Sequence, residues 1–399
     1  MNKENRNALL SDVYDFQYGM GNTIEDIGGD YPIYGSNGAV GFTNIFNSED
    51  APVIGHIGAY AGIVNWATGK HFVTYNGVIC RIKKGINPRF GYYLLLHSKL
   101  QKRLRGSTQP FVSYDLLYDV KVFLPNKIIQ NNIASVLTAL DSKIELNNRI
   151  IAKLEAMAKT LYDYWFVQFD FPDKNGKPYK TSGGKMVWNE ELKREIPEGW
   201  EVKSIDYYAN VIDPHPSHRA PLEVIDGYPF AGIGDIDEFG NIDINKARVI
   251  DEEFVLKQER DYTINDYSIG YGRVGTVGKV VKLRKQPFRF ALSPTMAIIN
   301  PKNNSLPSFV YFTVTNPTFL QWVNKYTSGS TRPAIGIQHL RTIPVIKPNV
   351  YSENLLEKFE KVVESSFKQT DILNKENQKL TKHRNWLLPM LMNGQVKAN

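Results

Sequence analysis

Cysteine is almost absent from this chain of 399 residues, and long apolar runs are missing altogether. The single cysteine, Cys80, can form neither an intramolecular disulfide nor a cluster of thiolate metal ligands, which suits a reducing compartment. We interpret it as a buried packing residue. No stretch approaches the length of a membrane-spanning helix, and the N-terminal MNKENRNALL has no apolar core of signal-peptide length. We therefore expect a cytoplasmic protein with no attachment to a membrane.

Neither sign of charge is scarce, and the balance is moderately basic. The chain has 48 Lys and Arg against 41 Asp and Glu, which gives a formal net charge of +7. Hydrophobic residues make up 42% of the sequence and charged residues 22%, a composition typical of a folded protein. Because phosphates attract basic surfaces and release counterions, this balance is compatible with a polyanionic partner without selecting one.

The chain contains an internal repeat. The stretch RGSTQPFVSYDLLYDVKVFLPN at residues 105 to 126 returns as SGSTRPAIGIQHLRTIPVIKPN at residues 328 to 349, with eight identities in 22 aligned positions. Chance would give about one or two identities. Looser counterparts follow in the same order: 31 to 42 with 228 to 239, 54 to 64 with 269 to 280, 72 to 82 with 290 to 300, and 88 to 95 with 307 to 314. Each half therefore predicts one α+β domain of short strands, glycine turns and a few helices.

A long helix of coiled-coil type is predicted after each copy of the repeat. Seam residues recur at alternating steps of four and three. The first seam consists of Ile133, Leu137, Leu140, Ile144, Asn147, Ile151, Leu154, Ala158, Leu161 and Trp165. The second is more polar and consists of Leu356, Phe359, Val363, Ser366, Thr370, Leu373, Asn377, Leu380, Arg384, Leu387 and Leu391. A helix of roughly forty residues is about 60 Å long, too long for one domain face, so we expect an antiparallel coiled coil that holds the two domains apart.

This order of domain, long helix, domain and long helix resembles the DNA-specificity (S) subunit of type I restriction-modification systems. The resemblance covers nearly the whole chain. It rests on YPIYGSNGAVGF, on both GST-containing segments, on LYDYWFVQFDFP at the end of the first helix, and on MVWNEELKREIPEGWEVKSI before the second domain. Two features depart from the family pattern. The first domain lacks the Pro-Glu-Gly-Trp opening found at residues 197 to 200, and Pro389 should stop or kink the second helix.

The resemblance implies how the chain is organised. Each of two target-recognition domains would read one part of a split, asymmetric DNA site, while the helices serve as spacer and docking surface. The expected segments are a first target-recognition domain at 1–126, a first spacer helix at 127–168, a linker rich in Lys, Gly and Pro at 169–198, a second target-recognition domain at 199–348, and a second spacer helix with the C-terminal tail at 349–399.

The resemblance also implies partners. They are double-stranded DNA, methyltransferase (M) subunits, expected to be two, and restriction or motor (R) subunits in the full complex. S-adenosylmethionine, ATP and Mg²⁺ would belong to those subunits, and this chain would bind no cofactor and perform no catalysis itself. A flipped adenine would enter the methyltransferase subunit rather than this chain. The bases recognised and the spacer length are not predicted from the sequence.

Two strings leave a methyltransferase alternative open. FAGIG at residues 230 to 234 is similar to the glycine turn that binds S-adenosylmethionine, and NPTF at 316 to 319 is similar to a catalytic Asn-Pro-Pro-Phe. The second proline is missing, however, and the first half of the repeat has neither string. A motif without its structural context remains a hypothesis, so the sequence favours the non-catalytic interpretation.

A nuclease alternative rests on Asp173, Glu191 and Lys193, which fit the loose Pro-Asp…Glu-x-Lys pattern. In that pattern the carboxylates hold Mg²⁺ and the lysine helps to activate water. All three residues fall in the expected linker, where a solvated charge run is the simpler interpretation. GYGRVG at residues 270 to 275 satisfies the dinucleotide fingerprint, but a strand pattern follows where the phosphate-binding helix should begin.

Candidates for DNA contact lie on the glycine-rich turns, because bases are read by side chains on turns or helix starts. In the first domain they are Tyr34, Ser36, Asn37, His56, Tyr60, Lys102, Arg103, Arg105, Ser107, Thr108 and Gln109, with the basic residues assigned to phosphates. In the second domain they are Arg273, Thr276, Lys279, Ser330, Thr331, Arg332, Gln338 and His339. Glycine, serine and threonine at these positions could equally be hairpin and cap structure, whereas for Arg273 and Arg332 DNA contact is favoured.

Overall fold

The chain folds into two compact units of the α+β class, as expected. The computed structural model describes residues 6–21, 26, 28–215, 220–237, 239–302, 306–349 and 353–396. The first unit comprises Met1–Asn148 with Lys375–Asn399, and the second comprises Arg149–Asn374. In the described part of the chain, no helix is both long enough and apolar enough to cross a membrane.

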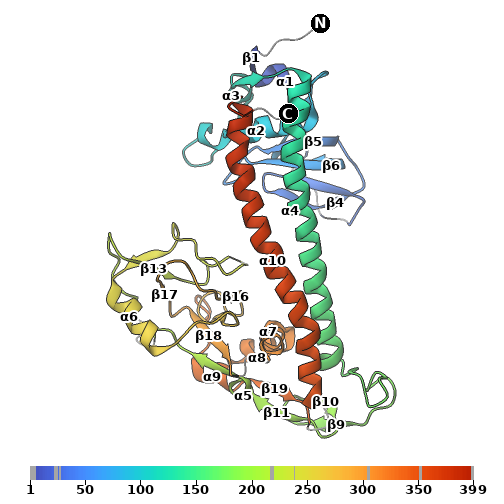
Figure 1. Cartoon of the computed structure of the whole chain (residues 1–399), viewed down its shortest axis with the longest axis vertical. Helices are drawn as coiled ribbons and strands as arrows, with labels where there is room; N and C mark the ends of the chain where they lie inside the picture. The colour runs from blue at the N-terminus through green and yellow to red at the C-terminus, as the bar shows by residue number, and fades with distance from the viewer. Residues whose placement is uncertain are drawn as a thin grey trace. The chain divides into compact units, whose positions relative to one another are not determined.

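Unit 1 is built on a six-stranded sheet in the order β2-β7-β5-β6-β3-β4. Strands β4, β5 and β6 of this sheet are labelled in Figure 1. Its strands are β2 (Tyr14–Tyr18), β3 (Tyr31–Gly35), β4 (Gly38–Thr43), β5 (Ser48–Gly55), β6 (Val64–Val73) and β7 (Gly77–Ile82). Neighbouring strands are antiparallel except β3 and β6, which run parallel. Cys80 in β7 is completely buried, as interpreted from the sequence.

Helices and a two-stranded ribbon complete unit 1. The elements are β1 (Arg6–Leu9), α1 (Leu10–Val13), α2 (Pro88–His97), the 3-10 turn η1 (Leu100–Arg103), α3 (Tyr114–Tyr118) and β8 (Lys121–Leu124). Helix α2 begins where Asn87 caps it: the Asn87 side chain accepts a hydrogen bond from the Phe90 backbone N–H, and Pro88 occupies the first turn. The helix buries Tyr93 and Leu94 against the core that Tyr14 enters from β2.

Unit 2 contains a four-stranded sheet, a three-stranded sheet and two ribbons. The sheets are β12-β18-β15-β16 and β14-β13-β17, and the ribbons are β9–β10 and β11–β19. The strands are β9 (Met186–Asn189), β10 (Arg194–Pro197), β11 (Glu201–Ser204), β12 (Ala209–Ile212), β13 (Tyr228–Ala231), β14 (Arg248–Ile250), β15 (Ile269–Gly272), β16 (Val280–Lys282), β17 (Ala291–Leu292), β18 (Met296–Pro301) and β19 (Pro344–Lys347). The short helices are α5 (Ile205–Tyr208), α6 (Glu252–Asp261), α7 (Pro307–Thr315), α8 (Pro317–Tyr326) and α9 (Ile337–Arg341).

The internal repeat is confirmed by strand register. In the β1–β8 ribbon Arg6 pairs with Leu124, and in the β11–β19 ribbon Glu201 pairs with Lys347 at the corresponding place. The helix that precedes the second strand of each ribbon, α3 or α9, spans five residues in both units. The parallel β3–β6 pair of unit 1 likewise returns as the parallel β13–β17 pair of unit 2.

Two long helices carry the predicted seams (Figure 1). They are α4 (Lys127–Tyr162), followed by a short π-helical segment (Asp163–Val167), and α10 (Glu353–Met392). In unit 1 Asn147 hydrogen-bonds Asn377, and in unit 2 the rings of Trp165 and Phe359 lie 6.2 Å apart. From Asn147 to Trp165 the chain advances eighteen residues along α4, while their partners move back eighteen residues along α10, from Asn377 to Phe359. The two helices therefore run in opposite directions, which confirms the antiparallel coiled coil. Pro389 lies inside α10, which ends three residues later at Met392.

The segment interpreted from composition as a linker, residues 169–198, is folded. It forms the antiparallel β9–β10 hairpin, and its aromatic side chains Phe169 and Phe171 are buried. Both belong to the core cluster of unit 2, together with Trp200 just beyond the hairpin. The lysine, glycine and proline residues of this segment are concentrated in its exposed turns. Its buried aromatic residues pack into the core of unit 2.

Candidate nucleic-acid interface

In unit 1 two glycine-containing loops meet: residues 55–62, between β5 and β6, and residues 105–111, which hold the GST string. The second loop is closed by reciprocal backbone hydrogen bonds, from Arg105 N–H to Phe111 O at 3.1 Å and from Phe111 N–H to Arg105 O at 2.8 Å. The first loop is tied to it by Gly58 N–H, which donates to Pro110 O at 2.8 Å. We call this arrangement a loop pair.

Unit 2 contains the same loop pair, formed by residues 272–279 and 328–334. Ser328 and Ala334 exchange backbone hydrogen bonds of 2.9 and 2.8 Å, and Gly275 N–H donates to Pro333 O at 2.8 Å. Each bond has its counterpart in unit 1 at the aligned position. The repeated sequence therefore encodes one local structure twice.

Glycine is required at the same point of both GST loops. Gly106 has a φ of 84° and Gly329 a φ of 89°, in the region that L-residues with side chains rarely adopt. A Cβ atom on Gly106 would lie 2.5 Å from the carbonyl oxygen of Gln109, and one on Gly329 would lie 2.8 Å from that of Arg332. The tight turn leaves the next three side chains exposed: Ser107, Thr108 and Gln109 in unit 1, and Ser330, Thr331 and Arg332 in unit 2.

Basic residues lead into the unit 1 loop. Lys102 and Arg103 lie in η1 and are exposed, as is Arg105 at the base of the loop. Arg105 forms an ion pair with Asp115 in α3. Lys102 and Arg103 therefore add positive charge to the segment that leads into the GST loop, while the charge of Arg105 is partly neutralised by its partner.

His56 does not lie at the surface. It is only 5% exposed, its Nδ1 lies 3.0 Å from the carbonyl oxygen of Tyr75, and its ring stacks on Tyr18 at 4.3 Å. Its own carbonyl oxygen accepts a hydrogen bond from Val112 N–H at 2.9 Å, just after the GST loop. Its observed role is therefore to join the two loops at their base.

Arg273 occupies the same place in unit 2 and is also buried, with 6% exposure. Its guanidinium forms an ion pair with Asp213 at 2.8 Å, and its carbonyl oxygen accepts a hydrogen bond from Ile335 N–H at 2.9 Å. The sequence favoured a DNA contact for this arginine. In the structure the side chain is directed into the domain, because Asp213 supplies the counter-charge there.

The β3–β4 turn approaches the first loop of unit 1. The Ser36 hydroxyl donates to Ile57 O at 2.9 Å or Asn76 O at 2.7 Å, so this residue supports the loop. Tyr34 is half-buried against the ring of His71, and burial raises the pKa of its hydroxyl. Asn37 and Tyr60 are exposed and remain available for contact.

In unit 2 the remaining candidates surround the loop pair. Thr276 is exposed, and Lys279 is exposed although its ammonium donates to Ile233 O at 3.0 Å. Gln338 and His339 are exposed on α9, where the His339 ring stacks on Tyr326 at 5.3 Å and almost parallel. This stacking fixes the orientation of His339 beside the GST loop.

Sequence reasoning missed the aromatic residues beside each loop pair. Tyr75 in unit 1 is 48% exposed and packs edge-on against His56, while Tyr18 stacks on Tyr114 at 4.0 Å. In unit 2 Lys325 lies 4.6 Å from the ring centroid of Trp322, just before the GST loop. The only sequence signal for these residues was aromatic density next to the repeat.

The enzyme-like strings occupy structural positions. Asn316 of NPTF caps α8, because its side chain accepts a hydrogen bond from Thr318 N–H at 2.9 Å. Asp173 accepts backbone hydrogen bonds from Asn175 and Lys177 in a turn, and Lys193 forms an ion pair with Glu190 at 2.7 Å. Within the ranges that the structure describes, no group of three or more His, Cys, Asp or Glu could hold a metal ion.

The two units correspond to two matches of one family model. The type I restriction modification DNA specificity domain matches residues 10–156 and again residues 197–382. The chain belongs to this DNA specificity family. Each matched region of the specificity subunit contains one complete loop pair, and neither the methyltransferase nor the nuclease alternative is favoured.

Similar proteins of known type support membership of the same family. The specificity subunit is 27% identical over 325 residues to the type I restriction enzyme MjaIX specificity subunit of Methanocaldococcus jannaschii, covering 79% of this chain and 71% of that protein. It is 25% identical over 370 residues to the HindI specificity subunit of Haemophilus influenzae, covering 77% of each. A crystal structure of an S subunit from M. genitalium shares the fold, with a TM-score of 0.58 and 18% identity over 98% of this chain and 96% of that one.

Proposed function

We propose that this specificity subunit binds duplex DNA and reads a split, asymmetric site, one part with each loop pair. The observation that carries the proposal is the duplicated loop pair, which has one backbone geometry but different exposed tips. Unit 1 presents Ser107, Thr108 and Gln109, whereas unit 2 presents Ser330, Thr331 and Arg332. The same frame with different side chains supports two different readings, because hydrogen-bonding side chains distinguish base edges in the major groove.

The exposed basic residues beside the loops would bind phosphates. Lys102 and Arg103 in unit 1 and Lys279 in unit 2 are the proposed contacts. Each neutralised phosphate releases counterions, so affinity should fall steeply with salt. His56 and Arg273, which are buried, and Ser36, whose hydroxyl bonds the loop backbone, are not among the proposed contacts.

We further infer that catalysis resides in partner subunits. Two methyltransferase subunits and the restriction or motor subunits would bring S-adenosylmethionine, ATP and Mg²⁺, in the cytoplasm. Exposed apolar side chains on the long helices support docking: Met157 on α4 is 67% exposed, and Ile372 on α10 is 60% exposed. The proposed target-recognition domains are residues 1–126 and 199–348, with 127–168 and 349–399 as spacers and 169–198 as a connection.

The deciding experiment exchanges one domain. Residues 1 to 124 are replaced with the corresponding domain of a relative, and the methylome of a host that expresses the complete system is sequenced. One half of the recognised site should change while the other half stays the same. If both halves changed together, the two loop pairs would not read independently.

A second experiment tests binding without catalysis. The purified chain should retard random duplex DNA in a gel-shift assay, with an affinity that falls across a salt series, yet should neither methylate nor cut it. Methyl transfer by the chain alone, abolished by Asn316→Ala, would overturn the non-catalytic assignment. Absence of DNA binding at low salt would instead favour a scaffold.

A further inference from the structure

The hairpin that carries the first loop of unit 2 lies at the edge of a sheet. The loop of residues 272–279 lies between β15 and β16, and β16 is the edge strand of the four-stranded sheet. Among the residues that the structure describes, its backbone pairs with β15 alone. Other contacts made by β16 therefore help to fix the direction of the loop.

A lysine at the end of β16 reaches two helices of unit 2. The Lys282 ammonium lies 5.7 Å from the ring centroid of Tyr311 in α7 and 5.2 Å from that of Phe367 in α10. At such distances the face of an aromatic ring attracts a cation. Burial lowers the pKa of the Lys282 ammonium, although Asp371 and Glu155 nearby act in the opposite direction. Lys282 is thus held, half-buried, where the strand meets the two helices.

Arg284, two residues after Lys282, connects the same strand to α10 through charge. Its Nη2 donates to both carboxylate oxygens of Asp371, at 3.0 and 3.2 Å. Phe367 and Asp371 are four residues apart on α10 and therefore lie on one face of the helix. The Arg284 side chain is 23% exposed and that of Asp371 is 43% exposed. Ion pairs of this exposure contribute little to global stability, so the chain should remain folded without it.

Unit 1 has a corresponding contact made by different side chains. Trp66 in β6 corresponds to Lys282 in β16, because each is the third residue of its strand and pairs with the residue three before the first glycine of the loop. The Trp66 ring packs edge-on against Tyr92 of α2 at 5.9 Å. In the sequence repeat, Tyr92 is aligned with Tyr311. The third residue of the strand therefore contacts the same tyrosine position in both units.

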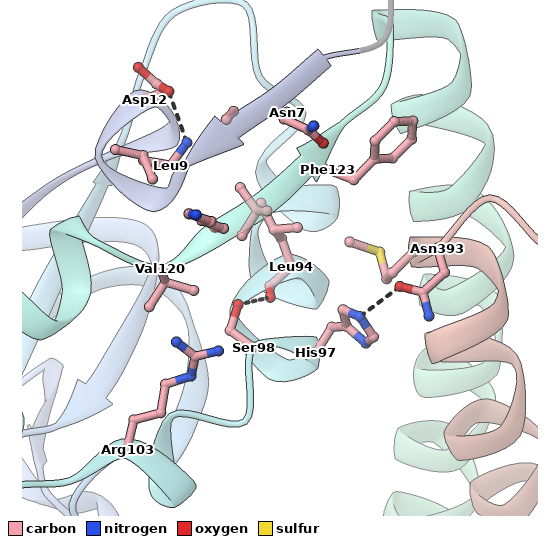
Figure 2. Close-up of a pocket in the computed structure, with 14 residues that line it drawn as sticks. Asn7, Leu9, Asp12, Leu94, His97, Ser98, Arg103, Val120, Phe123 and Asn393 are labelled. Atoms are coloured by element: carbon pink, nitrogen blue, oxygen red, sulfur yellow. Dashed lines mark hydrogen bonds between the residues drawn. The ribbon is translucent and has the colours of Figure 1, made fainter.

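Helix α2 is in turn connected to both long helices within unit 1. The Tyr93 hydroxyl donates to Asp141 Oδ2 in α4 at 2.6 Å. Figure 2 shows the end of α2, where His97 Nε2 lies 3.2 Å from Oδ1 of Asn393, the residue after α10. In unit 1 the connection thus runs from the strand through α2 to the long helices, whereas in unit 2 the strand also contacts α10 directly.

The gap between two DNA readings depends on the direction of each loop pair as well as on helix length. A gap one base pair longer or shorter displaces a half-site by about 3.4 Å and turns it by about 34°. A loop pair on a loosely held hairpin would tilt and accept such neighbouring gaps. We propose that Lys282 and Arg284 are positioning residues, which hold the unit 2 loop pair at one angle to α10 and thereby make the subunit accept a single gap. This inference rests on the proposed reading of a split site.

The test measures how strictly the gap is kept. Asp371→Asn removes the charge that faces Arg284 and keeps the shape of the side chain, and the methylome of a host that expresses the complete system is sequenced. Relative to sites with the preferred gap, methylation of sites one base pair longer or shorter should rise at least about ten-fold, equivalent to 1.4 kcal/mol, with both half-site sequences unchanged. Glu364→Gln is the matched control, because the partner of Glu364, Lys368, lies on the same helix at 2.6 Å. It should leave the gap as strict as in the unaltered system.

Further variants separate positioning from stability. Lys282→Met keeps an apolar side chain beside the two rings but removes the cation, and it should relax the gap in the same way. Arg284→Glu should relax it further, and the double variant Arg284→Glu/Asp371→Arg should restore strictness. A role in stability alone would lower methylation equally at all gaps, and a double variant as relaxed as Arg284→Glu would overturn the role of the ion pair.

Two negative results have different meanings. If the unaltered system methylates a split site and both Asp371→Asn and Lys282→Met keep its gap equally strict, this inference is overturned while the proposed function stands. If the unaltered system methylates no split site, the proposed function and this inference both fall.

Discussion

At the scale of single residues, the two GST loops share one backbone conformation but differ in their exposed side chains. The glycines at positions 106 and 329 have the same left-handed conformation, and the closing hydrogen bonds match. Three residues beyond each glycine, the chain has Gln109 in one loop and Arg332 in the other, both exposed. A neutral amide and a guanidinium favour different base edges, so this position is the first to test for specificity.

Arg332→Ala should lower affinity for the recognised DNA by about 1 to 3 kcal/mol. If the guanidinium contacts a base, the preference at one position of the site should relax. If it contacts a phosphate, the loss should be uniform across sequences, and the salt slope should become shallower by about one unit. Quantitative gel shifts over a salt series, with a library of site variants, distinguish these cases.

Gln109→Ala is the matched control for Arg332→Ala. It should affect only the half of the site read by unit 1. Unchanged affinity and preference in Arg332→Ala would remove this loop from the proposed contact surface.

At the scale of elements, α4 and α10 meet through a polar layer. Asn147 donates to Asn377 Oδ1 at 2.9 Å and to Glu376 Oε2 at 2.8 Å, and Asn377 donates to Asn148 Oδ1 at 2.7 Å. In the aligned seams, Asn377 corresponds to the buried Ile151 of α4. A second α4 in place of α10 would therefore set Asn147 against isoleucine, so the layer favours pairing of α4 with α10.

Asn147→Leu should destabilise the chain by about 1 to 3 kcal/mol, because it removes the partner of a buried amide. The double variant Asn147→Leu/Asn377→Leu should recover most of that loss, since two apolar residues then face each other. Urea unfolding of the two single variants and the double variant gives the coupling energy. Additive effects with no recovery would show that the two amides do not act as a pair.

A buried carboxylate connects α10 to α7 in unit 2. Glu360 is 7% exposed and accepts hydrogen bonds from Phe309 N–H at 2.7 Å and Ser308 N–H at 3.2 Å at the start of α7. Burial raises the pKa of Glu360 to about 7 from the ordinary value of 4.5, although these hydrogen bonds favour the charged form. Between about pH 4.5 and about pH 7 the folded state therefore holds a proton that the unfolded state has released.

Unfolding free energy should consequently fall as pH rises from about 4.5 to about 7, by up to about 3 kcal/mol from this group. Glu360→Gln cannot ionise and should lose that part of the pH dependence. The measurement is denaturant unfolding of both proteins at a series of pH values. Parallel stability curves over this interval would contradict the raised pKa.

At the scale of the whole molecule, each long helix contributes to the cores of both units. Leu137 and Leu391 lie in the main core of unit 1, and Ala158 and Phe359 lie in that of unit 2. Neither globular part is therefore separate from the coiled coil. If the helices set the spacing between the two DNA readings, a matched change in both should alter the preferred gap alone.

Inserting seven residues after Asn147 and seven after Glu376 keeps the seam in register and lengthens the pair by about 10 Å. The preferred gap should grow by roughly three base pairs, with both half-site sequences unchanged. Methylome sequencing reads out the gap directly.

A single insertion of four residues after Asn147 is the control. It rotates the following helix by about 40° and breaks the seam, so it should mainly destabilise the protein. An unchanged gap in a folded variant with the matched insertion would show that the helices do not set the spacing.

The sequence by itself determined the repeat, the two domains of α+β character and the seams of α4 and α10. These features are periodic or duplicated along the chain, so pattern alone reveals them. It also predicted that the two helices pair, because two long seams in one chain can bury each other, and the expected antiparallel direction was confirmed by the Asn147–Asn377 and Trp165–Phe359 contacts. Asn147 was visible as the polar position of the first seam before its partner was known.

Only the tertiary structure decided which candidate residues reach the surface. His56 and Arg273 stand in glycine-rich turns that resemble contact loops, yet both are buried, because Tyr18 and Asp213, far away in sequence, pack against them. The packing of Phe169 and Phe171 on Trp200 was equally invisible. Burial depends on which distant segments pack together, and no local pattern encodes that choice.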